Sequence, residues 1–340
     1  MDENTYQELE TEVWVKEICS GCGACVAVCP PGSIYFEPGK SSDNPMHTGY
    51  CKSADDGVAC GACYNVCPRV KDNLIEEDDL LGDYMCIMSA KSELDIPRRQ
   101  SGGAVTAMLM NALETGLIDA VVLVAEDPWT LKPYSAVISD SDSVVKKAGS
   151  RYNWWVPLVS ALNDAVIRQK YRNIAVVGVP CVAQAISRIR ESDLDLLGPF
   201  RDSIRVMIGL FCTETFDYVK LLEEKLSKEH SILPFQVERF DVKGKFEIIL
   251  DDGNTISIPL SELDDCVRPG CNVCTDFTAN YSDISAGSVG SPDGYTSLIV
   301  RTEKGKKLLD SAIEKGRLTV IDDCDLEIIE KMSAKKRKRK

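Results

Sequence analysis

Two groups of closely spaced cysteines near the amino terminus carry the strongest chemical signal in this sequence. The first has the spacing C-x2-C-x2-C-x3-C-P and the second has the spacing C-x2-C-x3-C-P. Their members are Cys19, Cys22, Cys25 and Cys29, and then Cys60, Cys63 and Cys67. Thiolates at this spacing wrap an inorganic cluster, and the first run is the signature of bacterial iron–sulfur carriers. The sequence therefore predicts a protein that transfers electrons.

The second group lacks a leading cysteine, and Cys51 can supply the missing ligand. In two-cluster ferredoxins the last cysteine of each run ligates the other cluster. We therefore predict two 4Fe-4S clusters, one held by Cys19, Cys22, Cys25 and Cys67, the other by Cys29, Cys51, Cys60 and Cys63. The alternative is a structural zinc site, which uses one set of four ligands arranged as two pairs.

A third constellation is spread along the chain. Cys271 and Cys274 form a C-x2-C pair, and Cys181 and Cys212 each follow a predicted strand. Since an α/β sheet gathers its ligands at the carboxyl ends of its strands, these four predict a third 4Fe-4S cluster. A redox disulfide or half of a zinc site is the alternative for the pair alone. Of the other cysteines, we interpret Cys266 as a reserve ligand for the third cluster. We interpret Cys86 and Cys324 as small buried apolar residues.

Composition narrows the class of protein. The chain has 340 residues and a formal net charge of -14, which is long enough for a well-buried core and two domains. Negative charge argues against general affinity for nucleic acid, because such binding depends on Lys and Arg neutralising phosphates. Cysteines clustered by motif indicate a reducing cytoplasm rather than disulfides. With no leader and no long apolar run, we expect a soluble, cytoplasmic protein.

The order of predicted elements indicates an α+β protein made of two domains and a tail. We expect a two-cluster ferredoxin-like domain over residues 1–80, closed by an acidic linker at 76–79, and an α/β mixed-sheet domain over 81–325. Within the second domain the apolar patterns predict strands at 120–124, 173–179, 204–211 and 296–301, helices at 104–114, 216–228 and 304–315, and a hairpin at 246–258. The tail, 326–340, ends in a basic run that we interpret as solvated, with docking to an acidic partner or a membrane surface as the alternative.

Several stretches of the second domain together resemble the family of beta subunits of coenzyme F420 hydrogenases and dehydrogenases. Short matches are QSGGA at 100–104, GSRY at 149–152, GVPC at 178–181 and GLFC at 209–212. Longer matches are RPGCNVCTDFT at 268–278 and DISAGSVGSPDG at 283–294. The resemblance covers residues 83–315 and implies FAD, one iron–sulfur cluster in this domain, and hydride exchange with coenzyme F420.

The ferredoxin-like extension is similar to that of the electron-input subunit of archaeal F420H2 dehydrogenases. This resemblance implies a subunit that oxidises reduced coenzyme F420 through FAD and passes electrons through clusters to other redox subunits. The partner would be a membrane-associated complex, reached at the inner face of the membrane, a formate dehydrogenase, or a ferredoxin. Two alternatives stay open: a formate dehydrogenase beta subunit that reduces F420, and a flavin-free polyferredoxin.

The resemblance also implies contacts for the flavin, at small or polar residues: Ser101, Gly102, Gly103, Ser150, Arg151, Tyr152, Gly287 and Gly290. A Ser-Gly-Gly run before a helix offers uncrowded backbone amides to a phosphate, although an ordinary capped helix start has the same pattern. The glycines near residue 290 permit close approach of a ligand or mark tight turns. His47 and His230 lie in no motif, and we assign no catalytic side chain.

Overall fold

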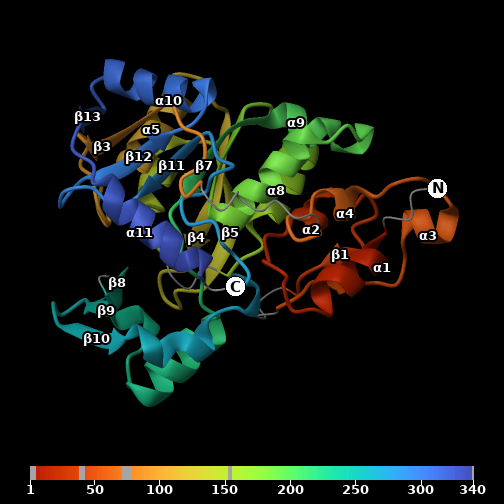
Figure 1. The fold of residues 1–340 in the computed structure, drawn as a ribbon, viewed down its shortest axis with the longest axis horizontal. Helices are drawn as coiled ribbons and strands as arrows, with labels where there is room; N and C mark the ends of the chain where they lie inside the picture. Colours follow the sequence, from red (N-terminus) through yellow and green to blue (C-terminus); the bar gives the residue numbers. More distant parts are fainter. Residues whose placement is uncertain (1–4, 38–42, 71–78, 152–154, 243, 339–340) are drawn as a thin grey trace.

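The computed structural model describes residues 5–37, 43–70, 79–151, 155–242 and 244–338. Figure 1 separates three parts by colour: an N-terminal part in red and orange, a large sheet with its helices, and a small sheet in teal. Of the acidic linker expected at 76–79, only Asp79 lies within the described residues. No helix among the described residues is long and apolar enough to cross a membrane.

The large sheet has eight strands in the order β13-β3-β12-β11-β7-β6-β4-β5. Their bounds are β3 (Cys86–Ser92), β4 (Ala120–Glu126), β5 (Pro133–Ile138), β6 (Ile174–Gly178), β7 (Ile204–Leu210), β11 (Ile284–Gly287), β12 (Thr296–Val300) and β13 (Leu318–Ile321). The four central strands β11, β7, β6 and β4 are parallel, and the outer pairings are antiparallel. This is the mixed sheet expected from the sequence, and its parallel strands bring four carboxyl ends to one edge.

The central strands are continuous apolar runs because helices cover both faces of the sheet. Along β4, Val122 and Val124 belong to one buried cluster, and Val121 and Leu123 belong to another on the opposite face. The helices behind these clusters are α5 (Ala104–Glu114), α6 (Ser141–Lys146) and α10 (Glu303–Glu314) on one face, and η2 (Leu158–Ser160), α7 (Ala161–Asn163), η3 (Asp164–Arg168), α8 (Pro180–Glu191), η4 (Asp195–Leu197) and α9 (Gly198–Ser203) on the other.

The N-terminal part is a set of short elements that pack onto the second helical layer. Its bounds are α1 (Tyr6–Leu9), η1 (Glu10–Trp14), α2 (Ala24–Val28), β1 (Ile34–Tyr35), β2 (Met46–His47), α3 (Lys52–Asp56) and α4 (Ala62–Asn65). The backbone of Val159 donates to the carbonyl of Cys22 at 2.9 Å, and the Asn163 side chain donates to the carbonyl of Ala27 at 2.8 Å. These bonds fix the first cysteine motif against the large domain.

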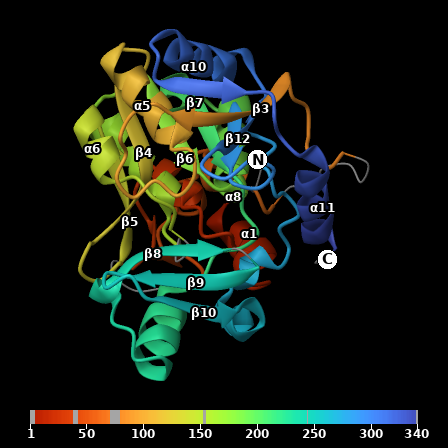
Figure 2. The same cartoon turned by 90° about the vertical axis from the view of Figure 1, so that its left-hand side faces the viewer.

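The small sheet forms a separate buried cluster below the large one (Figures 1 and 2). It contains η5 (Val219–Glu229), η6 (Pro234–Gln236), β8 (Val237–Val242), β9 (Lys245–Leu250), β10 (Thr255–Pro259) and η7 (Leu260–Cys266), and the short turn η8 (Pro269–Cys271) follows it. The hairpin expected at 246–258 is the pair β9 and β10, joined by the turn at 251–254. The strand β8 extends it to three antiparallel strands.

The first three residues of the basic run, 335–337, belong to a helix with a buried face, which corrects our interpretation of them as a solvated tail. Helix α11 (Leu326–Arg337) begins at Asp325, whose side chain accepts from the backbone of Ile328 at 3.2 Å. Residues spaced four and three apart along it are buried: Ile329, Ser333 and Lys336. Figure 2 shows α11 running along one side of the molecule, so its inward face is part of the folded structure.

The small sheet should depend on Phe246, which is fully buried and contacts the rings of Phe240 and Phe216 with centroid separations of 5.2 and 5.9 Å. We expect Phe246→Ala to lower the free energy of unfolding of this part by about 3–5 kcal/mol, because the change removes buried contacts and leaves a cavity. The matched control is Phe235→Ala, since Phe235 is 44% exposed. Denaturant unfolding should separate the two variants, and equal stability would contradict the packing described.

Candidate functional site

Both N-terminal cysteine motifs fold into the same local structure. In each, the sequence Cys-Gly-Ala-Cys places a glycine directly before a short helix, Gly23 before α2 and Gly61 before α4. Their φ angles are 82° and 63°, which glycine adopts readily and other residues rarely do. The positive φ turns the chain so that the cysteines on either side of each glycine stay near the start of the helix.

The first predicted set of thiols is brought together and buried. Burial raises the pKa of Cys25 well above its ordinary value. The thiols that lie close enough to raise it further include Cys22, Cys19 and Cys67. Burial likewise raises the pKa of Cys19 to about 11 and that of Cys67 to about 12. These four thiols therefore form one electrostatically coupled group.

The second predicted set forms a similar group around Cys63. Burial, followed by the effect of neighbouring thiols, raises the pKa of Cys63 to about 12. Those neighbours are Cys29, Cys60 and Cys51. Cys51 stands directly before helix α3, which turns the longer connection back toward the other three. The structure thus brings together the four residues assigned to the second cluster.

The third predicted set lies at the carboxyl edge of the large sheet. Cys181 is in the first turn of α8 and Cys212 follows β7, while Cys271 ends η8 and Cys274 lies in the loop after it. All four line one small cavity. Among the described residues, no three His, Cys, Asp or Glu side chains are arranged to hold a single metal ion.

The reserve ligand, Cys266, lies away from this set, in the buried cluster of the small sheet. Burial and the adjacent carboxylate of Asp265 raise its pKa to about 12. Cys324 packs beside Ser297, with its sulfur 3.6 Å from the hydroxyl oxygen. Neither residue lines the cavity that holds the third set; besides the four thiols of that set, Cys22 of the first set lines it.

Two buried cations that sequence reasoning missed lie against the third set. Arg69, two residues after Cys67, donates to the carbonyl of Gly270 at 3.1 Å, and Lys336 comes from α11. Burial alone would raise the pKa of Cys274, but these two cations lower it below its ordinary value. Because Arg69 comes two residues after a cysteine motif, the sequence could have indicated that its charge lies near the thiols.

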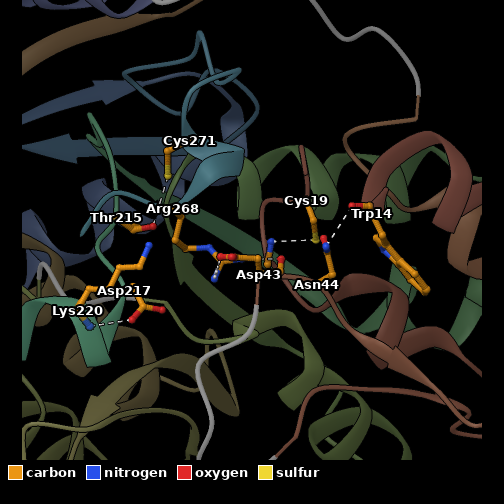
Figure 3. Close-up of polar contacts among 10 residues, drawn as sticks. Trp14, Cys19, Asp43, Asn44, Thr215, Asp217, Lys220, Arg268 and Cys271 are labelled. Atoms are coloured by element: carbon orange, nitrogen blue, oxygen red, sulfur yellow. Dashed lines mark hydrogen bonds and ion pairs between the residues drawn. The ribbon is translucent and has the colours of Figure 1, made fainter. Parts of the chain in front are cut away.

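A third buried cation, Arg268, lies between Cys19 of the first set and Cys271 of the third set in Figure 3. Its side chain is 1% exposed, acts electrostatically on Cys19 and Cys271, and donates to the carbonyl of Asp43 at 2.9 Å. The guanidinium stacks over the ring of Trp155, 4.5 Å from its centroid. Because Arg268 contacts the N-terminal part from the large domain, it holds the two thiol sets beside one another.

The three sets are arranged in a row. Cys63 is close enough to Cys25 to raise its pKa, which links the second set to the first. Cys22 acts in the same way on Cys181, whose pKa burial already raises well above its ordinary value. The first set is therefore the middle member of the row, with the second set on one side and the third on the other.

A larger cavity, of about 310 Å³, opens beside the third set. It lies where β4, β6, β7 and β11 end, and residues of the small sheet and Met332 of α11 close it. Helix α5 begins in its wall after Gly103, which has a φ of 71° and no side-chain cap. The first-turn amides of α5 thus face a cavity without an acceptor from a capping side chain, which suits a phosphate group.

The larger cavity and the small cavity that contains the third set share some of their lining residues. Cys212 and Thr213 contribute to both, as do the two residues that follow. Gly287 lies opposite Phe211, because a side chain at 287 would overlap the phenylalanine ring. A planar group in the cavity would therefore lie next to the third set of thiols.

Five of the expected flavin contacts line the cavity: Ser101, Gly103, Ser150, Arg151 and Gly287. Two others, Gly102 and Gly290, are not among the residues that line it. Gly102 lies against the backbone of β3 and β12, where any side chain would overlap the carbonyl of Ala90. Gly290 faces Ile329 of α11 instead of the cavity. The remaining residue, Tyr152, lies outside the described residues.

Arg151 is buried and already has a carboxylate partner. Its Nε lies 3.4 Å from Glu126, and it donates to the carbonyl of Gly149 at 2.6 Å. Burial lowers the pKa of Arg151 and raises that of Glu126. The pair keeps the guanidinium fixed in the cavity wall, so this cation is preorganised for an anionic ligand.

Comparison with known proteins identifies the family. Models of the coenzyme F420 hydrogenase/dehydrogenase beta subunit match residues 87–163 (N-term) and 171–325 (C terminus), and a 4Fe-4S dicluster domain matches residues 18–70. One of the subunits of the F(420)H(2) dehydrogenase of Methanosarcina mazei is 32% identical over 96% of this chain and 91% of its own length. The chain belongs to the family of coenzyme F420 hydrogenase/dehydrogenase beta subunits. This membership confirms the resemblance seen in the sequence.

Two further similarities support the family assignment and the fold. An uncharacterised protein of Methanocaldococcus jannaschii is 41% identical to this chain, over 98% of each of the two sequences. A chain of the F420-reducing NiFe hydrogenase complex from Methanosarcina barkeri matches with a TM-score of 0.72 and 30% identity, covering 78% of this chain and 92% of that chain. The expected α+β class is confirmed, and this family member is an iron–sulfur protein of an F420-dependent oxidoreductase family.

The contact between the first and third sets should be sensitive to Gly270. A side chain at 270 would overlap the carbonyl oxygen of Cys19, so Gly270→Ala should separate the two segments. We expect a loss of about 1–3 kcal/mol of stability from this overpacking, together with a lower iron content. The control is Gly198→Ala, where the nearest atom is 3.5 Å away. Iron analysis and denaturant unfolding compare them, and a wild-type iron content in Gly270→Ala would be contrary to the geometry.

Proposed function

We propose that this protein oxidises reduced coenzyme F420 and delivers the electrons to a partner redox subunit, as the input subunit of an F420H2 dehydrogenase. One observation carries the proposal: the cavity that suits a flavin shares Cys212 with the third thiol set. The similarity to a component of the Methanosarcina mazei F(420)H(2) dehydrogenase supports it, because that similarity covers 96% of this chain and so spans both the cavity and the N-terminal sets.

The residues that would hold the cofactors follow from the site. The cavity residues Ser101, Gly103, Ser150, Arg151 and Gly287 would hold FAD, with the first turn of α5 at its phosphates. The three thiol sets would hold three 4Fe-4S clusters. FAD, when bound, exchanges a hydride with a deazaflavin and single electrons with a cluster. This chain would hold the flavin and the clusters in a fixed order and exclude water from the space between them.

The order of the three thiol sets gives a proposed path for electrons through the molecule. The third set adjoins the cavity, the first set lies in the middle, and the second set is at the far end. Cys51 and Cys60 of the second set are partly exposed, and α3 beside them has no buried residue. We propose that the partner subunit approaches this face, where the distance from a cluster to the surface is short.

Cofactor analysis of protein purified without oxygen tests the proposal directly. We expect one FAD and about twelve irons per chain, as three four-iron clusters require. Mixing with reduced coenzyme F420 should bleach the flavin and cluster absorbance in a rapid-mixing spectrophotometer. Protein that holds its iron but has no FAD, and does not react with reduced F420, would refute the proposal and leave a polyferredoxin.

Removing one thiol of the third set should abolish the third cluster without affecting the two N-terminal clusters. We expect Cys212→Ser to lose about four irons while keeping the remaining eight, because the N-terminal sets use other cysteines. Its flavin should still be reduced by F420, but electrons should no longer reach the N-terminal clusters. The control is Cys324→Ser, which should keep all its iron, since Cys324 contacts Ser297 and lies in another buried cluster.

A further inference from the structure

Lys336 occupies an unusual place for a lysine in a basic carboxyl-terminal run. Its side chain is 2% exposed, and its ammonium donates to the carbonyl of Cys212 at 2.6 Å and to that of Asp276 at 2.7 Å. Both acceptors are neutral carbonyl groups. The next residue toward the amino terminus, Lys335, is exposed, so only one of two adjacent lysines is directed into the protein.

A buried ammonium requires compensating negative charge nearby. The carboxylate of Asp276 is one source, but it also faces the buried guanidinium of Arg301. The other source is the third thiol set, because Cys274 and Cys212 act electrostatically on Lys336. Lys336 itself lines the cavity that contains these thiols. The position therefore suits a strongly negative group in that cavity.

Helix α11 brings this charge from outside the region that the family models match, which ends at residue 325. One turn earlier, Met332 of the same helix lines the larger cavity. The helix thus contributes one residue to each of the two adjoining cavities. The same helix also buries Ile329 in an apolar cluster with Leu81 and Phe277, which holds it against the large domain.

We propose that Lys336 raises the reduction potential of the cluster held by the third thiol set. Reduction adds one negative charge to a cluster, and a fixed positive charge in a medium of low dielectric favours the more negative state. Lys336 acts through space on the cluster and is a tuning residue rather than a ligand. The inference rests on the proposed function only in requiring a cluster at this site.

The test compares four variants of the full chain with bound cofactors. Lys336→Gln removes the charge but keeps a donor for the carbonyls, Lys336→Met removes both, and Lys336→Arg keeps the charge. Lys335→Gln removes the same charge from the exposed neighbour. We expect the neutral variants at 336 to lower the ratio of reduced to oxidised third cluster at least tenfold at a fixed potential, equivalent to about 59 mV for one electron.

Redox titration followed by electron paramagnetic resonance gives this ratio, and iron analysis shows whether the third cluster is present. A potential unchanged in Lys336→Gln with full iron would overturn the inference while leaving the proposed function intact. A wild-type protein without a third cluster would instead refute the proposed function. Arg69 remains beside the thiols in every variant, so assembly should survive. If both neutral variants lose the third cluster and Lys336→Arg keeps it, the result would support a need for positive charge at 336. If Lys336→Arg loses the cluster as well, the inference would be overturned.

Discussion

The burial of many thiols beside a few fixed cations is the constraint on which this structure depends. A buried group resists ionisation, and burial raises the pKa of Cys25, Cys181 and Cys212 accordingly. A cluster requires the same groups as thiolates, so binding must release protons and bring its own positive charge. Cys274 is different, because buried cations already lower its pKa. At Cys274 of the third set, therefore, the protein itself favours the thiolate form.

The cations that surround the thiols come from distant parts of the chain, and this links assembly of the site to folding. Arg69 follows the second cysteine motif, Arg268 precedes the C-x2-C pair, and Lys336 lies in the last helix. Arg69 also donates to Gly270, and Arg268 donates to Asp43, so each side chain joins the N-terminal part to the large domain. Charge near the clusters and contact between the parts are thus provided by the same residues.

Local patterns in the sequence predicted those features that local interactions determine. The helix at 104–114 has the bounds of α5, and the strand at 173–179 contains β6, because apolar periodicity specifies each without knowledge of its neighbours. The cysteine spacing grouped the thiols of the first two sets, and the predicted strand ends placed Cys181 and Cys212 beside the C-x2-C pair. The buried face of α11 was not predictable in this way, since two of its three buried residues are polar. The contact between Gly290 and Ile329 of the same helix was not predictable either.

The position of Cys212 explains why the sheet is central to the function. This residue follows β7, in the middle of the sheet, and its backbone donates to the carbonyl of Phe277 at 2.9 Å. On one side it lines the large cavity, and on the other it belongs to the third thiol set. A rigid strand end therefore sets the separation between a group in the cavity and a cluster, as precise redox geometry requires. The first and second sets lie on short elements of the N-terminal part, which packs onto the sheet's helical layer through a shared buried cluster and through bonds such as that between Cys22 and Val159. The cavity and the third set are thus part of the core, while the first and second sets lie on the N-terminal part.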